Sequence, residues 1–138
     1  MLLFAKDQLI LVVAPSQNSQ QAELFCLEDG KVVFDPFMVS IGRNGLAASA
    51  KQEGDGKTPA GEFGLGAVFG YEKDLKFNIG YIYADESLVC VDDTTSALYN
   101  QIVPMPEVKP ASFEYMRRDD HQYELGVVVE YNQNNIAG

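Results

Sequence analysis

Short runs of branched and aromatic residues recur along the whole chain, and turn-forming residues separate them. This alternation restricts the fold more than any other feature, because Val, Ile and aromatic side chains favour strands whereas Gly, Pro and Asn favour turns. Helical periodicity is scarce by comparison. We therefore expect a mainly β fold, a sandwich or barrel with a few short helices.

The same pattern gives the positions of the expected elements. The Asp29-Gly30 pair predicts a tight hairpin turn between two of the strands. Two polar stretches with some apolar spacing predict short helices at Thr95–Ile102 and Ser112–Arg118. Strands are expected at 8–14, 22–27, 31–34, 37–41, 62–65, 76–83, 88–91 and 123–131.

Strand alternation also predicts a core, since alternate residues of a strand share one face. The side chains expected to be buried are Leu9, Leu11, Val13, Phe63, Val89, Val91, Val127 and Val129.

Length and charge limit the class of protein. A chain of 138 residues has the size of one domain, and no shift in composition marks a boundary, so a single domain over residues 1–138 is expected. Twenty acidic residues against 10 Lys and Arg give a formal net charge of -10. Such a charge repels phosphate backbones, which makes nucleic acid an improbable partner class.

The cysteines and the first residues of the sequence argue against a disulfide framework, a zinc site and a signal peptide. Cys26 and Cys90 are too few for a disulfide framework and lack zinc-ligand spacing, so we expect buried thiols, with a disulfide or a reactive thiol as the alternatives. We expect no metal and no cofactor. The apolar start is interrupted at once by Lys6 and Asp7, so this sequence shows no signal peptide.

A glycine-bearing segment at residues 47–58 contains Gly56-Lys57-Thr58, which superficially matches the end of a phosphate-binding loop. That motif needs a glycine where Lys51 stands and a helix where Pro59 follows. We therefore expect residues 57–63 to form a turn that enters a strand, not an anion-binding helix start.

His121 is the sole histidine of the chain, so any histidine-dependent acid/base chemistry within it must use this side chain. Its setting between Asp119-Asp120 and Gln122 favours a solvated surface residue. The alternative is a base that activates Cys26 or Cys90.

Several blocks, taken in order, resemble the L,D-transpeptidase (YkuD-like) family. The most specific block is Gly54-Asp55-Gly56-Lys57-Thr58-Pro59-Ala60-Gly61-Glu62-Phe63. The others are Val39 to Gly45, Phe69-Gly70-Tyr71, Val89 to Asp93 with Tyr99-Asn100, Met116 to Asp119, and Gly126 to Asn132.

This resemblance implies a β domain that acts on peptidoglycan stem peptides through a cysteine acyl-enzyme, in the cell envelope or periplasm. It implies that the chain is the N-terminal part of such a domain and incomplete at its C-terminus, because the family's histidine and Gly-Cys segment have no counterpart here. We accordingly expect no catalytic residue in this chain, and substrate contacts from Arg43, Lys57, Tyr99, Asn100 and Arg117. An open sheet edge near Val127 to Val129 is expected to permit a homodimer.

Three functional hypotheses follow. The first is part of an L,D-transpeptidase or L,D-carboxypeptidase that is itself inactive. The second is a non-catalytic module of the same fold that binds peptidoglycan or another protein. The third is a hydrolase that uses Cys90 with His121.

Overall fold

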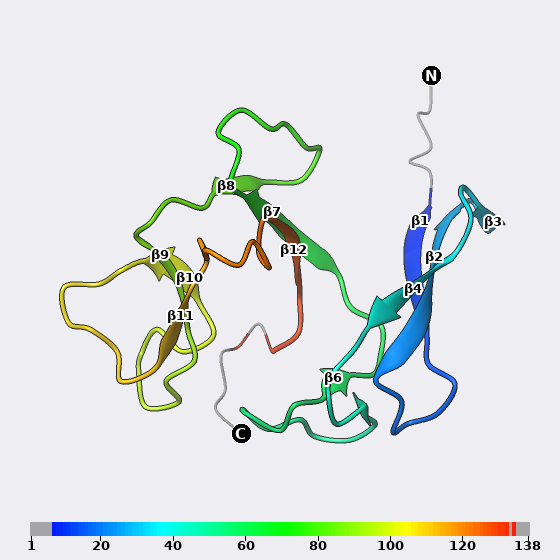
Figure 1. The fold of residues 1–138 in the computed structure, drawn as a ribbon, viewed down its shortest axis with the longest axis horizontal. Helices are drawn as coiled ribbons and strands as arrows, with labels where there is room; N and C mark the ends of the chain where they lie inside the picture. Colours follow the sequence, from blue (N-terminus) through cyan, green and yellow to red (C-terminus); the bar gives the residue numbers. More distant parts are fainter. Residues whose placement is uncertain (1–6, 133, 135–138) are drawn as a thin grey trace. The chain divides into compact units, whose positions relative to one another are not determined.

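The computed structural model describes residues 7–132 and 134, and its regular elements are all strands (Figure 1). The mainly β prediction is therefore confirmed. The twelve strands are β1 (Gln8–Val13), β2 (Gln21–Glu28), β3 (Lys31–Val32), β4 (Phe37–Ser40), β5 (Leu46–Ala47), β6 (Thr58–Pro59), β7 (Leu65–Gly70), β8 (Tyr81–Tyr83), β9 (Leu88–Val91), β10 (Ile102–Pro104), β11 (Phe113–Tyr115) and β12 (Leu125–Val129).

The chain divides into two compact units, the first ending at Gly61 and the second beginning at Glu62. In unit 1, β2 pairs antiparallel with β1 along one side, and with β3 and β4 along the other. A short parallel pair, β5 with β6, follows in the same unit. The expectation of a single domain stays a prediction.

The Asp29-Gly30 hairpin is confirmed by the backbone of unit 1. Both residues have positive φ, 50° and 75°, as a two-residue turn between β2 and β3 requires. The turn forms where predicted because its conformational preference is local.

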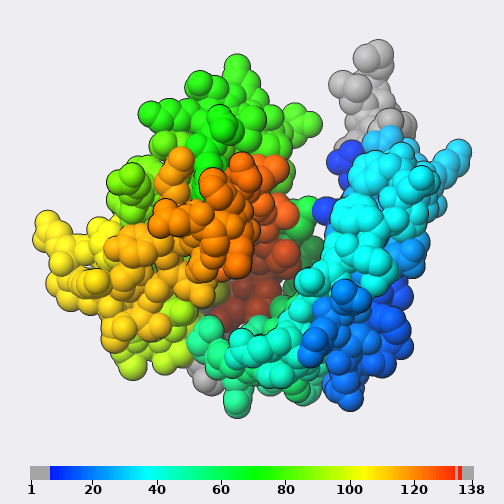
Figure 2. Space-filling view, in the orientation of Figure 1, coloured from blue at the N-terminus to red at the C-terminus, as the bar shows by residue number. Residues whose placement is uncertain are grey.

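The predicted burial of β1 is wrong. Leu9, Leu11 and Val13 are 50%, 42% and 47% exposed, and their neighbours Ile10 and Val12 are equally open. Both faces of the strand therefore lie open. Residues 31–40, cyan in Figure 2, lie on the visible surface of this unit. The exposed apolar side chains among them are Val32, Val33, Phe34, Phe37 and Met38.

Unit 2 contains two three-stranded sheets. In one, β9 lies between β10 and β11, and in the other β7 lies between β12 and β8. The burial predicted for Val89 and Val91 is confirmed, since both side chains are 0% exposed. A hydrophobic cluster of Phe69, Ala84, Leu88 and Met116 packs in this unit with Tyr71, Ile82, Cys90, Ile102, Tyr123 and Val128 against it.

Both predicted helices are wrong, because the described residues contain no helix. Residues 95–100 form turns, and Phe113–Tyr115 is strand β11, paired antiparallel with β9. A helix at 112–118 would satisfy few backbone groups of its own, whereas pairing with β9 satisfies the edge of a buried strand. The tertiary partner overrides the weak local preference.

The predicted face of β12 is also wrong by one residue. Val127 and Val129 are 38% and 48% exposed, whereas Val128 packs against the cluster. Gly126 faces inward as well, and a Cβ there would overlap the Phe69 ring. A shift of one residue moves every side chain to the other face of a strand.

Several strand bounds differ from those expected. Glu62 to Gly64 precede β7 instead of forming a strand, and only Tyr81–Tyr83 of the predicted 76–83 strand is regular. Phe63 is half-buried, edge-on to Tyr131 with ring centroids 5.5 Å apart. As predicted, no helix begins after Lys57, and the chain instead enters β6.

Candidate functional site

The glycine-bearing loop of unit 1 is held by hydrogen bonds between residues 42–45 and 55–58. The Gly42 N–H donates to Thr58 Oγ1 at 2.8 Å, and the Asn44 N–H donates to the Gly56 carbonyl at 2.9 Å. The Asn44 amide also donates to the Asp55 carbonyl at 2.8 Å. These bonds join the two halves of the loop.

Gly45 requires its glycine for two reasons. Its φ is 79°, in the left-handed region that side chains disfavour, and a Cβ there would overlap the carbonyl oxygen of Gln17. The next residue, Leu46, donates its N–H to that same carbonyl at 2.8 Å. The loop is thereby fixed against the turn that follows β1.

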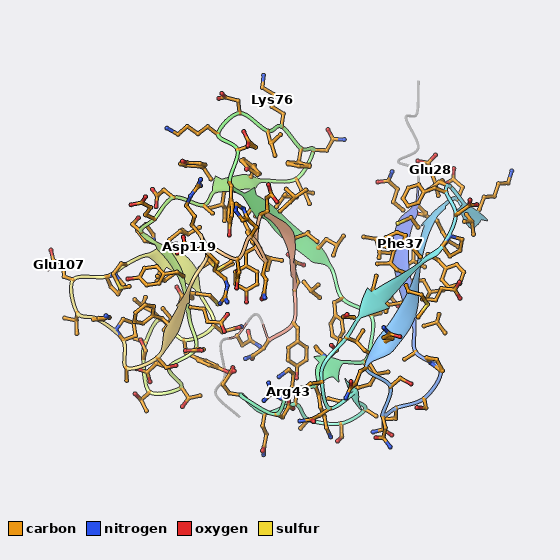
Figure 3. The ribbon with its side chains drawn as sticks, in the orientation of Figure 1. Glu28, Phe37, Arg43, Lys76, Glu107 and Asp119 are labelled. Atoms are coloured by element: carbon orange, nitrogen blue, oxygen red, sulfur yellow. The ribbon has the colours of Figure 1, made fainter. Side chains whose placement is uncertain are left out.

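Two of the predicted substrate contacts adjoin Gly56: Lys57 follows it in the sequence, and the Arg43 side chain approaches it in space. The Arg43 side chain, labelled in Figure 3, lies so close that a Cβ on Gly56 would stand 2.9 Å from Arg43 Nε. Both side chains are exposed. The structure therefore brings these two cations to one loop.

Asp55 supports this loop from within. Its Oδ1 accepts the Lys57 N–H at 2.8 Å, its Oδ2 accepts the Gln52 N–H at 3.0 Å, and Lys51 Nζ pairs with it at 3.0 Å. The backbone hydrogen bond from Lys57 is the main cause that lowers the pKa of Asp55 to about 2, with Gln52 and Lys51 adding to it. The carboxylate stays ionised and organises the turn.

In unit 2, Arg117 is held in a fixed position. Its guanidinium lies over the Tyr71 ring, 4.7 Å from the centroid. Its Nη1 donates to the Ala84 carbonyl at 3.0 Å and, at 3.4 Å, to that of Tyr71. Tyr71 also anchors the next residue, since its hydroxyl accepts the Arg118 N–H at 2.8 Å. The half-buried Arg117 is therefore oriented by the fold.

A depression of about 400 Å³ opens beside Arg117, lined by Tyr83, Asp85, Glu86 and Ser87. Asp85 Oδ1 accepts both the Ser87 hydroxyl at 2.7 Å and the Ser87 N–H at 2.8 Å. These bonds from Ser87 are the main cause that lowers the pKa of Asp85, and the charge of Arg117 adds to it. The depression therefore presents a fixed cation and a fixed anion.

The neighbouring Arg118 is engaged differently. It forms a two-pronged salt bridge with Asp120, in which Nε donates to Oδ1 and Nη2 donates to Oδ2. This salt bridge raises the pKa of Arg118 and lowers that of Asp120 to about 2. The Arg118 guanidinium also lies over the Tyr123 ring. Arg118 is thus paired with a carboxylate of the same chain, whereas no described carboxylate is bonded to Arg117.

Tyr99 and Asn100 lie in the turn after β9. Tyr99 is 7% exposed, so its side chain belongs to the interior of unit 2. Asn100 has a φ of 62°. Its backbone N–H donates to the Val91 carbonyl at 2.7 Å, and its side-chain amide donates to the Asn132 carbonyl at 3.0 Å. Their observed contacts shape this turn, and their predicted role toward substrate stays a prediction.

The histidine and the cysteines lie in different settings. His121 has φ of 58° and its ring centroid is 6.1 Å from that of Tyr71. Cys26 lies in β2, and Cys90 lies in β9 against the hydrophobic cluster, both half-buried and without a disulfide. Within residues 7–132 and 134, no three His, Cys, Asp or Glu side chains gather as metal ligands.

Sequence reasoning missed Tyr71, Asp85 and Ser87 as parts of the Arg117 site. Tyr71 was visible as a member of a family-like block, but its contact with Arg117 spans 46 residues. Asp85-Glu86-Ser87 has the composition of an ordinary turn, and nothing local connects it to Arg117.

Comparisons with known proteins give no relative: no family model, no curated protein and no solved structure matches the chain. In the described part of the chain, no helix is long and apolar enough to cross a membrane.

Proposed function

We propose that this chain is part of an L,D-transpeptidase-like protein of the bacterial cell envelope that binds peptidoglycan stem peptides. The proposal rests on the ordered sequence blocks and on one structural observation, the oriented Arg117 beside an open depression. No nucleic-acid partner and no cofactor enters it.

Arg117 suits a peptide carboxylate for a physical reason. A guanidinium is planar and binds carboxylates through paired N–H donors, and it loses least entropy when it is already held in place. Tyr71 and the Ala84 carbonyl hold it here. Stem peptides end in a carboxylate, so the matching group is present in the proposed ligand.

We also propose that the cysteines of this chain do not transfer acyl groups. A cysteine nucleophile needs a base or a positive dipole to form its thiolate. Cys90 packs in an apolar cluster close to Tyr123, whose hydroxyl donates to Glu114 at 2.7 Å. Because Cys90 packs among apolar side chains, we rank the hydrolase hypothesis last.

The decisive experiment titrates the purified chain with a stem tetrapeptide. Calorimetry measures the affinity, and product analysis detects any turnover. We expect binding without turnover, and about a tenfold loss of affinity in Arg117→Gln because a charge-assisted hydrogen bond is lost. Arg118→Gln is the matched control and should bind normally, since Arg118 is already paired. Equal binding by Arg117→Gln would refute the site.

Two further readouts separate the remaining hypotheses. Incubation with a carbapenem should add no mass at Cys26 or Cys90. Stoichiometric labelling together with stem-peptide turnover would instead favour the Cys90 hydrolase. Binding to intact peptidoglycan sacculi but not to the free stem peptide would favour the alternative, a non-catalytic module of the same fold.

Self-association through β12 is a related proposal. This strand pairs with β7 on one side and with no other strand of the described residues, and Leu125 and Val129 are 58% and 48% exposed. Exposed apolar edges favour pairing with another copy. Sedimentation should detect a dimer that Val127→Lys weakens, and a monomer at all concentrations would contradict it.

A further inference from the structure

The depression at Arg117 presents opposite charges that are not bonded to each other. Arg117 and Asp85 both line it, yet they form no direct ion pair in the part of the chain that the structure describes. Each is held by other groups. This arrangement leaves room for a ligand that carries both charges.

Arg117 keeps donors free for such a ligand. Its hydrogen bonds to Ala84 and Tyr71 both use Nη1, so Nε and Nη2 donate to no described residue. The stacking on Tyr71 covers one face of the guanidinium and leaves its edge as the binding surface.

Asp85 keeps an acceptor free in the same way. Both donors of Ser87 go to Oδ1, and a backbone hydrogen bond from Leu88 also contributes to lowering the pKa of Asp85. The two oxygens of a carboxylate offer about four lone-pair sites, so these three donors leave acceptor capacity for a ligand. The side chain is exposed and ionised, and the neighbouring Glu86 adds a second negative charge to the lining. A cationic amine is the complementary group.

We propose that this depression binds a free α-amino-acid group, its carboxylate on Arg117 and its ammonium on Asp85, with Tyr83 forming the side wall. The inference rests on the proposed function, because a stem peptide that carries an unacylated amino-acid centre is the ligand it would recognise there. Selectivity arises because a ligand with a single charge leaves one of the two fixed charges unpaired.

The experiment compares three small probes on the whole chain by amide-shift NMR, with the Ser87 amide as reporter. The probes are alanine, N-acetyl-alanine, which lacks the ammonium, and alaninamide, which lacks the carboxylate. Both enantiomers of each are used. We expect alanine to bind at least tenfold more tightly than either blocked form.

Variants assign each charge to its residue. Asp85→Asn keeps an oxygen for Ser87 but removes the charge, so it should abolish the preference over N-acetyl-alanine. Arg117→Gln should abolish the preference over alaninamide. Asp93→Asn is the matched control, since Asp93 Oδ1 accepts the Thr95 N–H and hydroxyl in the same way but does not line this depression.

The outcomes distinguish this inference from the function on which it rests. Equal binding of alanine and N-acetyl-alanine to the unmodified chain overturns the inference, whatever the variants do, and leaves stem-peptide binding untouched. Stem-peptide binding without any alanine binding overturns it too. Alanine binding without stem-peptide binding instead refutes the proposed function, and binding of neither refutes both.

Discussion

The two units use apolar strands in opposite ways. In unit 1, β1 is apolar from Leu9 to Val13 and pairs along its full length with β2, yet its side chains stay 42–50% exposed. In unit 2, β9 is equally apolar and Val89 and Val91 are completely buried. A regular sheet therefore satisfies backbone groups without creating a core, which needs a second layer of side chains.

Different interactions should therefore stabilise each unit. The described contacts of unit 1 concentrate in backbone hydrogen bonds around Gly45 and Asp55. Those of unit 2 concentrate in the cluster around Phe69 and Leu88. The predictions below test this contrast, beginning with the largest expected effect.

Gly45→Ala should destabilise unit 1 by about 3 kcal/mol, because it adds left-handed strain to an overlap with the Gln17 carbonyl. Gly30→Ala is the control: its φ is 75°, but a Cβ there meets nothing within 4 Å, so only the strain of about 1 kcal/mol remains. Urea unfolding measures both. Equal losses would show that the close approach at Gly45 does not matter.

Val91→Ala should destabilise unit 2 by about 2 kcal/mol, since it removes two buried methyl groups. Leu11→Ala removes more atoms, yet should cost less than about 1 kcal/mol because Leu11 is 42% exposed. The same urea series gives both values. If Leu11→Ala destabilises the protein by more than this, other side chains cover β1 in solution, and the contrast between the two units is wrong.

The loop at Asp55 should weaken in acid. The folded-state pKa of Asp55, about 2, lies below its ordinary value of 3.8, so its stabilising effect is present above pH 3.8 and is lost as the pH falls toward 2. Hydrogen exchange of the Lys57 and Gln52 amides should accelerate over this range. Asp55→Asn should make their exchange free energies independent of pH there, and an unchanged acid dependence would assign the effect to another group.

Tyr123 in unit 2 should titrate late. The hydrogen bond to Glu114 is the first cause that raises the pKa of Tyr123 from 10.0 to about 12, followed by partial burial. Its stabilising effect is thus complete below pH 10 and is lost as the pH rises through about 12. Tyrosinate absorbance should show a late component near pH 12 from Tyr123, beside that of Tyr81, whose pKa is raised mainly by burial. Glu114→Gln should move the Tyr123 component back toward pH 10, whereas Glu107→Gln, an exposed control, should leave it in place.

Local features of the sequence determined much of the strand pattern. The segments at β1, β2, β4 and β9 were predicted because branched side chains favour extended backbone, and the Asp29-Gly30 turn because its positive φ angles suit those residues. The glycine-bearing segment at residues 47–58 was also expected to form a loop, although nothing local predicted that Arg43 lies beside Gly56. All of these preferences act over a few residues.

Tertiary structure alone decided what these strands touch. Phe113–Tyr115 became a strand because β9 offered it a pairing edge, and β12 turned Val128 inward because Phe69 occupies the space above Gly126. Arg117 was expected to contact substrate from the family resemblance, but its fixed orientation depends on Tyr71 and Ala84, which lie 46 and 33 residues earlier in the chain. Local sequence sets backbone preference, whereas burial and a binding site depend on which distant surfaces meet, and periodicity does not encode that choice.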